Sequence, residues 1–482
     1  MNTRSQIERR PADLDVESEI LLCPTCATAN VLGASRCVEC FRRLNEVAPS
    51  SPETARTVQH ALDVARKRKR LLAIAGVVFV LMLLAGWRLY DFYGFTRFMG
   101  DPTTTISSTP ASVNDWPMVH RNPSHNGLVR DAVFTPTGEV VWSFDFDTTI
   151  SGSPAVVDGV VYVGAGRQGF VALDGGTGDT LWHQPMTAEV ITSVTVAGDF
   201  LYGGLRDGRV VAVNRHTGDI EWELLTGNKV FSTPVVVDGI AYVGSGDFYL
   251  YAVDAATGDV RWTYRAGNAI VASPAVTEEV IAFMAQDRKL YILETKSAKL
   301  RFDYQVDFTG NSPSIFEDRV YVGDSDGVLR SIDWHQRTWP FEKAFAALRY
   351  QGWWFGLASL ENQKGFVWGF STPESSILGT PVSSDNLVYV TSSNGRLYAV
   401  DRETGLESWH FRVSGPATAA PTVLGDTVIL ADHQGRIYGL KAGTGQLLWE
   451  IQGLAGTISS PPIFANKTLY VVTEEGVLAA VR

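Results

Sequence analysis

A segment of about forty residues repeats along most of this chain. Units that start at Ser153, Ser193 and Thr233 begin 40 residues apart, and each reads as four short strands separated by D-G and T-G turns. Four antiparallel strands per repeat of this length are typical of one blade of a β-propeller. We therefore expect an all-β, eight-bladed ring. The remaining units start at Ser273, Ser312, Thr380, Ala420 and Ser460.

The last repeat indicates how the ring closes. It ends in "GVLAAVR" at Arg482 and contains only three strands, whereas "TGEVVWSF", Thr137 to Phe144, precedes the first unit and has the form of a fourth. Pairing the N-terminal strand with the last unit would leave no unpaired strand edge between the chain ends. We predict that this strand closes the propeller.

An apolar run precedes the repeats. The segment "LLAIAGVVFVLMLLAGW", Leu71 to Trp87, carries no charge and follows the basic cluster "RKRKR", Arg66 to Arg70. Its length approaches the roughly 30 Å hydrocarbon thickness of a bilayer. A buried core helix is the alternative, but five consecutive basic residues favour a membrane helix. It starts too far along for a cleaved signal peptide, and the basic flank should stay cytoplasmic. The basic cluster is also suited to anionic headgroups. We expect a plasma-membrane protein with one span.

All four cysteines lie in "CPTCATANVLGASRCVEC" on the predicted cytoplasmic side. Two C-x2-C knuckles supply four thiolates, the tetrahedral set that zinc prefers, and so short a module could hardly bury a core without metal. Disulfides are the alternative, but they require an oxidising compartment. The run resembles the zinc-ribbon family, with Ala27 and Phe41 where the family has glycine. The predicted ligands of one structural zinc ion are Cys23, Cys26, Cys37 and Cys40.

Charge separates the two halves of the chain. Residues 1–100 hold 14 Lys and Arg against 10 Asp and Glu, which leaves 27 against 42 for the rest. An acidic propeller would not neutralise phosphates, so we expect no nucleic-acid binding. The predicted organisation is a disordered N-terminus (1–20), a zinc ribbon (21–44), a linker with the basic cluster (45–70), a transmembrane helix (71–93), an extracytoplasmic linker (94–115) and the propeller (116–482) with an insertion (335–365).

The turn before the last strand of each unit carries a recurring motif. "ALDGGTGDTLW" (172–182), "AVDAATGDVRW" (252–262) and "AVDRETGLESW" (399–409) are the fullest examples, and "DWPMVHRNPSHNG" (115–127) precedes the first unit. These runs resemble the pyrroloquinoline-quinone-like propeller superfamily, in which the tryptophan packs between neighbouring blades. The fourth unit has Phe302 in its place. The resemblance implies docking roles for Trp142, Trp182, Trp222, Trp262, Trp368, Trp409 and Trp449.

The same resemblance bears on catalysis. The dehydrogenases of this superfamily hold their quinone against adjacent disulfide-bonded cysteines and coordinate calcium, but this propeller contains no cysteine. We expect no enzyme and no quinone. The chain is similar to the propeller lipoprotein of the outer-membrane assembly machinery, which implies a scaffold that binds a protein partner in the envelope. Two alternatives stay open: a quinoprotein dehydrogenase, and a transmembrane sensor that couples an external ligand to the ribbon. The oligomeric state is left open.

Strand order places the turns on two faces of the ring. Turns between the first and second strands, and between the third and fourth, lie at one end; those between the second and third lie at the other. Aligning Trp368 with the tryptophan of other units places the insertion, rich in aromatic residues, at the first end. We expect it to contact lipid or a membrane partner, or alternatively to cap the channel. The candidate partner-binding residues are Trp339, Tyr350, Trp353, Trp354 and Phe355 in the insertion and Arg167, Arg206, Asp247 and Arg288 on the opposite face.

Overall fold

The computed structural model describes residues 19–92 and 112–482, apart from residues 27, 113, 131, 133, 308–309, 340, 358, 360–361, 374, 378 and 455. The chain divides into two compact units, Met1–Thr96 and Arg97–Arg482. Each unit is described by itself. The predicted disordered segment before residue 19, most of the predicted linker 94–115 and Ala27 lie outside the described residues.

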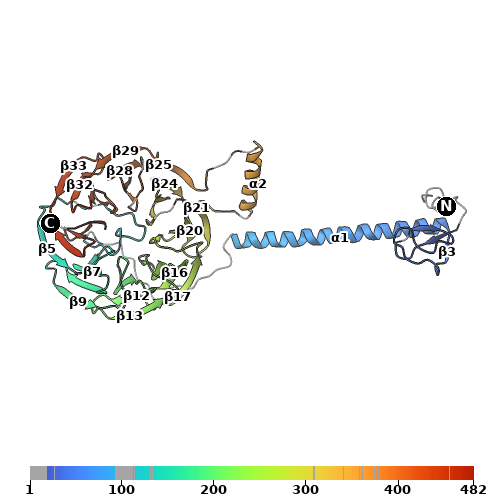
Figure 1. The fold of residues 1–482 in the computed structure, drawn as a ribbon, viewed down its shortest axis with the longest axis horizontal. Coiled ribbons are helices and arrows are strands. Elements are labelled where there is room, and N and C mark those ends of the chain that lie inside the picture. The colour runs from blue at the N-terminus through green and yellow to red at the C-terminus, as the bar shows by residue number, and fades with distance from the viewer. Residues whose placement is uncertain are drawn as a thin grey trace, which may run out of the picture. The chain divides into compact units, whose positions relative to one another are not determined.

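The first unit contains a small sheet followed by a long helix (Figure 1). Strand β1 (Ile20–Leu22) pairs antiparallel with both β2 (Ala29–Val31) and β3 (Pro49–Ser50). The sheet therefore includes residues beyond 44, because β3 returns to pair with β1. Helix α1 runs without interruption from Pro52 to Phe92. Glu53 lies in its first turn, where a negative charge is favourable.

The second unit is built from antiparallel sheets of the kind that form propeller blades, and Figure 1 shows them around a common centre. The sheets follow one another along the chain, and seven of them contain four consecutive strands. The first four are β6 (Ala155–Val157), β7 (Val160–Gly164), β8 (Phe170–Asp174) and β9 (Thr180–Gln184); β10 (Thr195–Ala197), β11 (Phe200–Gly204), β12 (Arg209–Asn214) and β13 (Ile220–Leu225); β14 (Val235–Val237), β15 (Ile240–Gly244), β16 (Tyr249–Asp254) and β17 (Val260–Arg265); and β18 (Ala275–Val276), β19 (Val280–Ala285), β20 (Lys289–Glu294) and β21 (Leu300–Gln305).

Four further sheets continue the series, which gives eight within the described residues. They are β22 (Ser314–Phe316), β23 (Arg319–Gly323), β24 (Val328–Asp333) and β25 (Phe366–Ser371); β26 (Val382–Ser383), β27 (Leu387–Ser392), β28 (Arg396–Asp401) and β29 (Glu407–Arg412); β30 (Thr422–Leu424), β31 (Thr427–Ala431), β32 (Ile437–Lys441) and β33 (Leu447–Ile451); and β34 (Ile463–Ala465), β35 (Thr468–Val472) and β36 (Val477–Val481).

The last sheet takes its fourth strand from the beginning of the unit. Strand β5 (Val140–Asp145) pairs antiparallel with β36, and Trp142 lies opposite Ala480. The Thr137 hydroxyl donates a hydrogen bond to the backbone carbonyl of Arg482 at 2.7 Å. A second N-terminal strand, β4 (Leu128–Val129), pairs in parallel with β30. The two ends of the unit are thus joined by strand pairing, as the three-strand count of the last repeat predicts.

The blades are joined by aromatic seams. In each of five seams, an indole nitrogen in the last strand of one sheet donates a hydrogen bond to a backbone carbonyl in the next, at 2.8–3.0 Å. A tyrosine from the second strand shares that carbonyl in some seams: Trp222 and Tyr202 both donate to Ala255. The five donors are Trp142, Trp182, Trp222, Trp368 and Trp409.

The glycines of the T-G turns pack against these indole rings. Gly258 has a φ of +80°, and a Cβ there would lie 2.8 Å from the indole of Trp222 in the preceding blade. Both the backbone angle and the ring exclude larger residues. The fourth blade replaces this glycine by Ala298 (φ 53°), and within the described residues the buried Trp262 ring nitrogen has no hydrogen-bond partner. At the following seam Phe302 faces Gly365, so phenylalanine takes the tryptophan position there.

Candidate functional site

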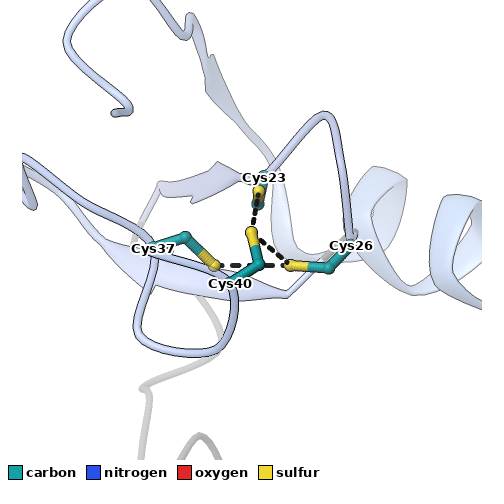
Figure 2. Close-up of side chains that lie close together, drawn as sticks. All are labelled: Cys23, Cys26, Cys37 and Cys40. Atoms are coloured by element: carbon teal, nitrogen blue, oxygen red, sulfur yellow. Dashed lines mark hydrogen bonds between the residues drawn. The ribbon is translucent and has the colours of Figure 1, made fainter. Parts of the chain in front are cut away.

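The four cysteines of the first unit converge at one point (Figure 2). Their sulfur atoms all lie within 4.8 Å of one another, with Cys23 Sγ 3.5 Å from Cys40 Sγ and Cys26 Sγ 3.4 Å from Cys37 Sγ. All four are free thiols. Tetrahedral zinc with bonds of about 2.3 Å would set the sulfur atoms roughly 3.8 Å apart, so the cluster has the size of a metal site.

Backbone groups favour the thiolate form of Cys23 and Cys37, whereas the pKa of Cys40 is raised to about 12, because a hydrogen bond from the Arg42 backbone is outweighed by those with the other cysteine side chains. Burial opposes ionisation of Cys23, but hydrogen bonds from the backbone of Cys26 and Thr25 outweigh it and lower the pKa of the thiol. The pKa of Cys37 is likewise lowered, because backbone hydrogen bonds from Cys40 and Glu39 overcome the effect of burial. Four thiolates of this geometry would hold a zinc ion and leave no open coordination position, which fits a structural role.

Two residues support the knuckles around the cysteines. The buried Asn30 side chain accepts a hydrogen bond from the backbone nitrogen of Val38 at 2.9 Å and donates one to the Thr28 carbonyl at 2.7 Å. It thereby ties the second knuckle to the first. The sequence analysis missed Asn30, since a single asparagine in a short strand carries no distinctive pattern. Phe41 has a φ of 59°, in the left-handed region that favours glycine.

The segment before β5 runs along the inner edges of the blades. The first strands of neighbouring sheets, such as β6, β10 and β14, contact one another and therefore line the centre of the ring. Residues 116–127 form backbone hydrogen bonds of 2.6–3.4 Å to six of these strands. The bonded pairs are Trp116 with Val156, Pro117 with Val196, Pro123 with Val276, Ser124 with Ile315, Asn126 with Ser383 and Gly127 with Val423. The centre is thus occupied by the chain itself.

Two buried histidines belong to this central segment. The rings of His120 and His125 lie 5.4 Å apart, and His125 Nδ1 is 3.3 Å from the Pro313 carbonyl oxygen. Burial lowers the pKa of His125 to about 4, against the opposing hydrogen bond to Pro313. Burial, and then repulsion by His125, lowers the pKa of His120 well below its ordinary value. Both imidazoles are therefore neutral in the folded ring.

These histidines should make propeller stability depend on pH. Because the folded pKa of His125 is about 4 and the unfolded value about 6.5, stability is fully present above pH 6.5 and is lost as the pH falls towards 4. His125 alone should account for about 2–3 kcal/mol between pH 7 and pH 4.5. Thermal unfolding of the propeller across this range measures the loss. His125→Asn tolerates the φ of 58° and should remove the share of the dependence that comes from His125, while the share from His120 is kept; an unchanged slope would assign the dependence to other groups.

On the other face of the ring, turns between the second and third strands form a groove between the first two blades. Glu189 accepts a hydrogen bond from Arg167 at 2.9 Å and also pairs with Arg206. These residues line a shallow groove of about 430 Å³ together with Met186, Thr187, Ala188 and Asp207. The structure therefore brings together Arg167 and Arg206 from the turns between the second and third strands of neighbouring blades. Glu189 was missed, because the loops between blades do not share a motif.

The other two polar candidates lie apart from this groove. Asp247 accepts hydrogen bonds from the Gly227 nitrogen and the Tyr251 hydroxyl, both at 2.7 Å, so its carboxylate links its own blade to the loop after β13. Arg288 lies 4.0 Å from Asp307 in the fourth blade. The turn residues thus do not form one continuous charged site in the described structure.

The insertion contains helix α2 (Glu342–Trp354), between β24 and β25 of the fifth blade. Trp368 pairs with Ser331 across these strands, in the register of the other docking tryptophans. Figure 1 shows α2 outside the ring, so it does not cap the centre. Its aromatic residues are exposed, and the rings of Tyr350, Trp353 and Trp354 lie within 6.4 Å of one another.

The first unit also contains a helix suited to a membrane. Within α1, Lys67–Gly86 is long and apolar enough to cross a bilayer, and none of it is buried. Composition and length alone support this assignment.

Solved structures similar to this chain share its fold at low sequence identity. BamB from Moraxella catarrhalis aligns with a TM-score of 0.56 and 17% identity, covering 73% of this chain and 98% of that one. Quinohemoprotein alcohol dehydrogenase from Comamonas testosteroni aligns with a TM-score of 0.59 and 15% identity, covering 78% of this chain and 81% of that one. These similarities establish the fold alone, so any activity must be argued from the residues of this chain.

The residues of the propeller do not fit a quinone site of the dehydrogenase kind. Residues 41–482 contain no cysteine that could form the ring of adjacent cysteines. Within the described residues, the one cluster of three or more potential metal ligands is the four-cysteine site of the first unit. The central segment also occupies the inner edges of six blades.

Curated relatives match parts of the chain. The outer membrane protein assembly factor BamB of Legionella pneumophila is 27% identical over 195 residues, which cover 35% of this chain and 49% of that protein. BamB of Alkalilimnicola ehrlichii is 28% identical over 200 residues, 36% of this chain and 51% of that protein. The serine/threonine-protein kinase AfsK of Streptomyces griseus is 36% identical over 103 residues, 19% of this chain and 13% of that protein. The chain thus spans about half the length of the BamB relatives.

A family profile covers the propeller almost completely. The profile described as outer membrane protein assembly factor BamB matches residues 125–232, 227–339 and 357–482. The gap between the second and third matches falls within the insertion that carries α2. With its repeated blades, its docking tryptophans and matches over more than half its length, the chain belongs to the BamB family of PQQ-like β-propeller repeat proteins.

Proposed function

We propose that this protein is a single-span plasma-membrane protein whose eight-bladed propeller is a non-catalytic scaffold for a protein partner in the cell envelope. The N-terminal unit stays in the cytoplasm and holds one structural zinc ion. The basic cluster before the span supports this orientation by the positive-inside rule. Membership in the BamB family supports an envelope partner.

One observation carries the scaffold proposal: residues of the same chain cover the inner strands of six blades. Six backbone contacts fix the segment 116–127 to the inner strands. When the inner strands are covered, the turns between strands are the part of the ring whose sequence can vary freely. Turns on a rigid scaffold often carry binding functions. This arrangement favours partner binding over chemistry in the channel.

The groove around Glu189 is the partner site that we favour. The Arg167 side chain is 82% exposed and that of Arg206 is 50% exposed, while Glu189 holds both guanidinium groups over a partly apolar floor. Arginine is enriched at protein interfaces because its planar group forms directed pairs with carboxylates. With Glu189 and Asp207 beside the two arginines, the groove presents both signs of charge, and a partner loop that carries polar groups of both signs fits this surface.

Affinity purification of the membrane-extracted protein, followed by mass spectrometry, tests the proposal. We expect the same envelope protein to be recovered in repeated preparations, and the double variant Arg167→Ala/Arg206→Ala to reduce its recovery roughly tenfold or more, since desolvated interface arginines contribute several kcal/mol. Folding should be unaffected, because exposed ion pairs contribute about 0–1 kcal/mol.

The matched control is Arg130→Ala. Arg130 forms an exposed pair with Asp385 at 2.6 Å, at a turn between the first and second strands and so on the opposite face. Recovery should be retained in this variant. Equal loss in both variants would argue against the groove, and a quinone absorbance spectrum in the purified protein would replace the scaffold with a quinoprotein enzyme.

A further inference from the structure

Helix α2 and the residues after it form an exposed aromatic surface, defined by Phe345, Leu348, Tyr350, Trp353, Trp354, Phe355 and Leu357. Phe355 and Leu357 are 80% and 83% exposed. A helix of 13 residues is marginally stable alone in water, and Phe341 provides no side-chain cap at its beginning. Such a surface therefore gains stability from an apolar partner.

The charges of the insertion are gathered at its base. Lys364 forms an ion pair with Glu342, and Arg337 pairs with Glu294 of the fourth blade at 2.7 Å. The backbone nitrogen of Thr338 donates to the Arg301 carbonyl at 2.7 Å, which fixes the base of the insertion to the ring. From Phe345 to Leu357 the only charged residue in the sequence is Arg349. Its long stem allows the charge to reach water beside an apolar phase.

The aromatic surface lies on the face of the propeller at which the described chain enters it. Asp115, where the described chain enters the ring, accepts a hydrogen bond from the Asp158 nitrogen in the first turn of the first blade. That turn is bonded to the turn between the third and fourth strands, since Gly175 donates to Gly159 at 2.8 Å. The insertion occupies the equivalent turn of the fifth blade, between β24 and β25.

We propose that the aromatic surface of α2 inserts into the interface of the phospholipid bilayer in which α1 is anchored. The inference rests on the proposed membrane anchor. Residues 93–111 can extend over at most roughly 65–70 Å, so the propeller stays close to the bilayer. A tether of this length keeps the bilayer at high effective concentration. Tryptophan and tyrosine favour the headgroup region, and the near absence of charge makes the attraction apolar.

Photo-crosslinking of the full-length chain in phosphatidylcholine liposomes tests this inference. The benzophenone analogue of phenylalanine replaces Trp354 in one variant and Phe231 in another. Phe231 is 41% exposed and lies in a loop on the opposite face, where Val230 donates to the Leu205 carbonyl. We expect lipid adducts at position 354 to exceed those at position 231 by roughly tenfold, at low and high salt alike. Equal yields, loss of the adduct at high salt, or cross-links to a second copy at 354 would overturn it.

A second measurement guards against a misfolded photoprobe variant. Brominated lipids should quench less tryptophan fluorescence in Trp353→Ser/Trp354→Ser than in the unmodified chain, since the quenching of Trp87 fluorescence is common to both. Equal quenching in the two proteins would contradict the inference. Carbonate extraction separates the two proposals: a chain that is washed from the liposomes lacks the membrane anchor, whereas a retained chain without lipid adducts has the anchor but no inserted α2.

Discussion

Removal of the proposed zinc ion is expected to unfold the N-terminal ribbon while the propeller stays folded. The buried core of the ribbon consists of Leu21, Cys23, Cys37 and Leu44, with few partly buried neighbours. So small a core cannot offset the conformational entropy of ordering the chain, whereas structural zinc sites contribute about 10–16 kcal/mol. Two of the four buried core residues are themselves predicted ligands, so losing the metal also removes the reason for their burial.

Hydrogen exchange of the full-length chain before and after chelation measures this effect. Amides of β1 and β2 should lose protection on chelation and in Cys37→Ser, and metal analysis should give one zinc per chain before treatment. Phe41→Gly is the matched control in the same knuckle: its φ of 59° suits glycine, so metal content and protection should be retained. Unchanged protection in metal-free protein would contradict a structural role for the metal.

A fragment that begins at Asp147 should not form the native propeller, whereas a fragment that begins at Ser112 should. The shorter chain loses the central segment, β4 and β5 together. Loss of β5 exposes the edge of β36 and removes Trp142 from its seam with Gly175. Removing one such aromatic residue typically costs 3–5 kcal/mol, and the whole change exceeds the 5–15 kcal/mol that stabilise a typical domain.

Near-ultraviolet circular dichroism and gel filtration distinguish the two fragments. The fragment that begins at Ser112 should be monodisperse and unfold cooperatively. The fragment that begins at Asp147 should lack fixed aromatic signals and aggregate through its free strand edge. Native spectra and equal unfolding midpoints for the two would show that closure by β5 contributes little.

The repeat predicts most of the fold because most blades pack against their neighbours through the same residue types at the same positions. The T-G turn requires a glycine against the preceding indole, and this requirement is visible in sequence at Gly178, Gly218 and Gly258. The position of Trp368 follows from the same periodicity despite the insertion. Departures are harder to interpret: Ala298 takes the glycine position in the fourth blade and the Trp262 nitrogen of the third has no partner in the described structure, but neither has the Trp449 nitrogen, whose neighbouring turn keeps its glycine.

The candidate sites also divide into those that the sequence predicts and those that it does not. Cysteine spacing predicts a cluster because the two knuckles are local, and the structure brings the four sulfurs within 4.8 Å. The groove at Glu189 was not predictable as a site, because it combines two turns and an inter-blade loop. The path of residues 116–127 was likewise hidden, since its partners are backbone atoms of six blades and any side chains satisfy backbone hydrogen bonds.

Closure by an N-terminal strand has a consequence for the order in which the molecule is made. Thr137 and its hydrogen-bond partner Arg482 are separated by 345 residues. The central segment and β5 are synthesised first, yet β5 finds its partner only when the last residues have been made. Folding that waits on so distant a contact is slow, and the intermediate exposes unpaired strands to neighbours. The proposed membrane anchor α1 is also made before the blades, so in that proposal the chain is held at the bilayer while its strand edges are unpaired.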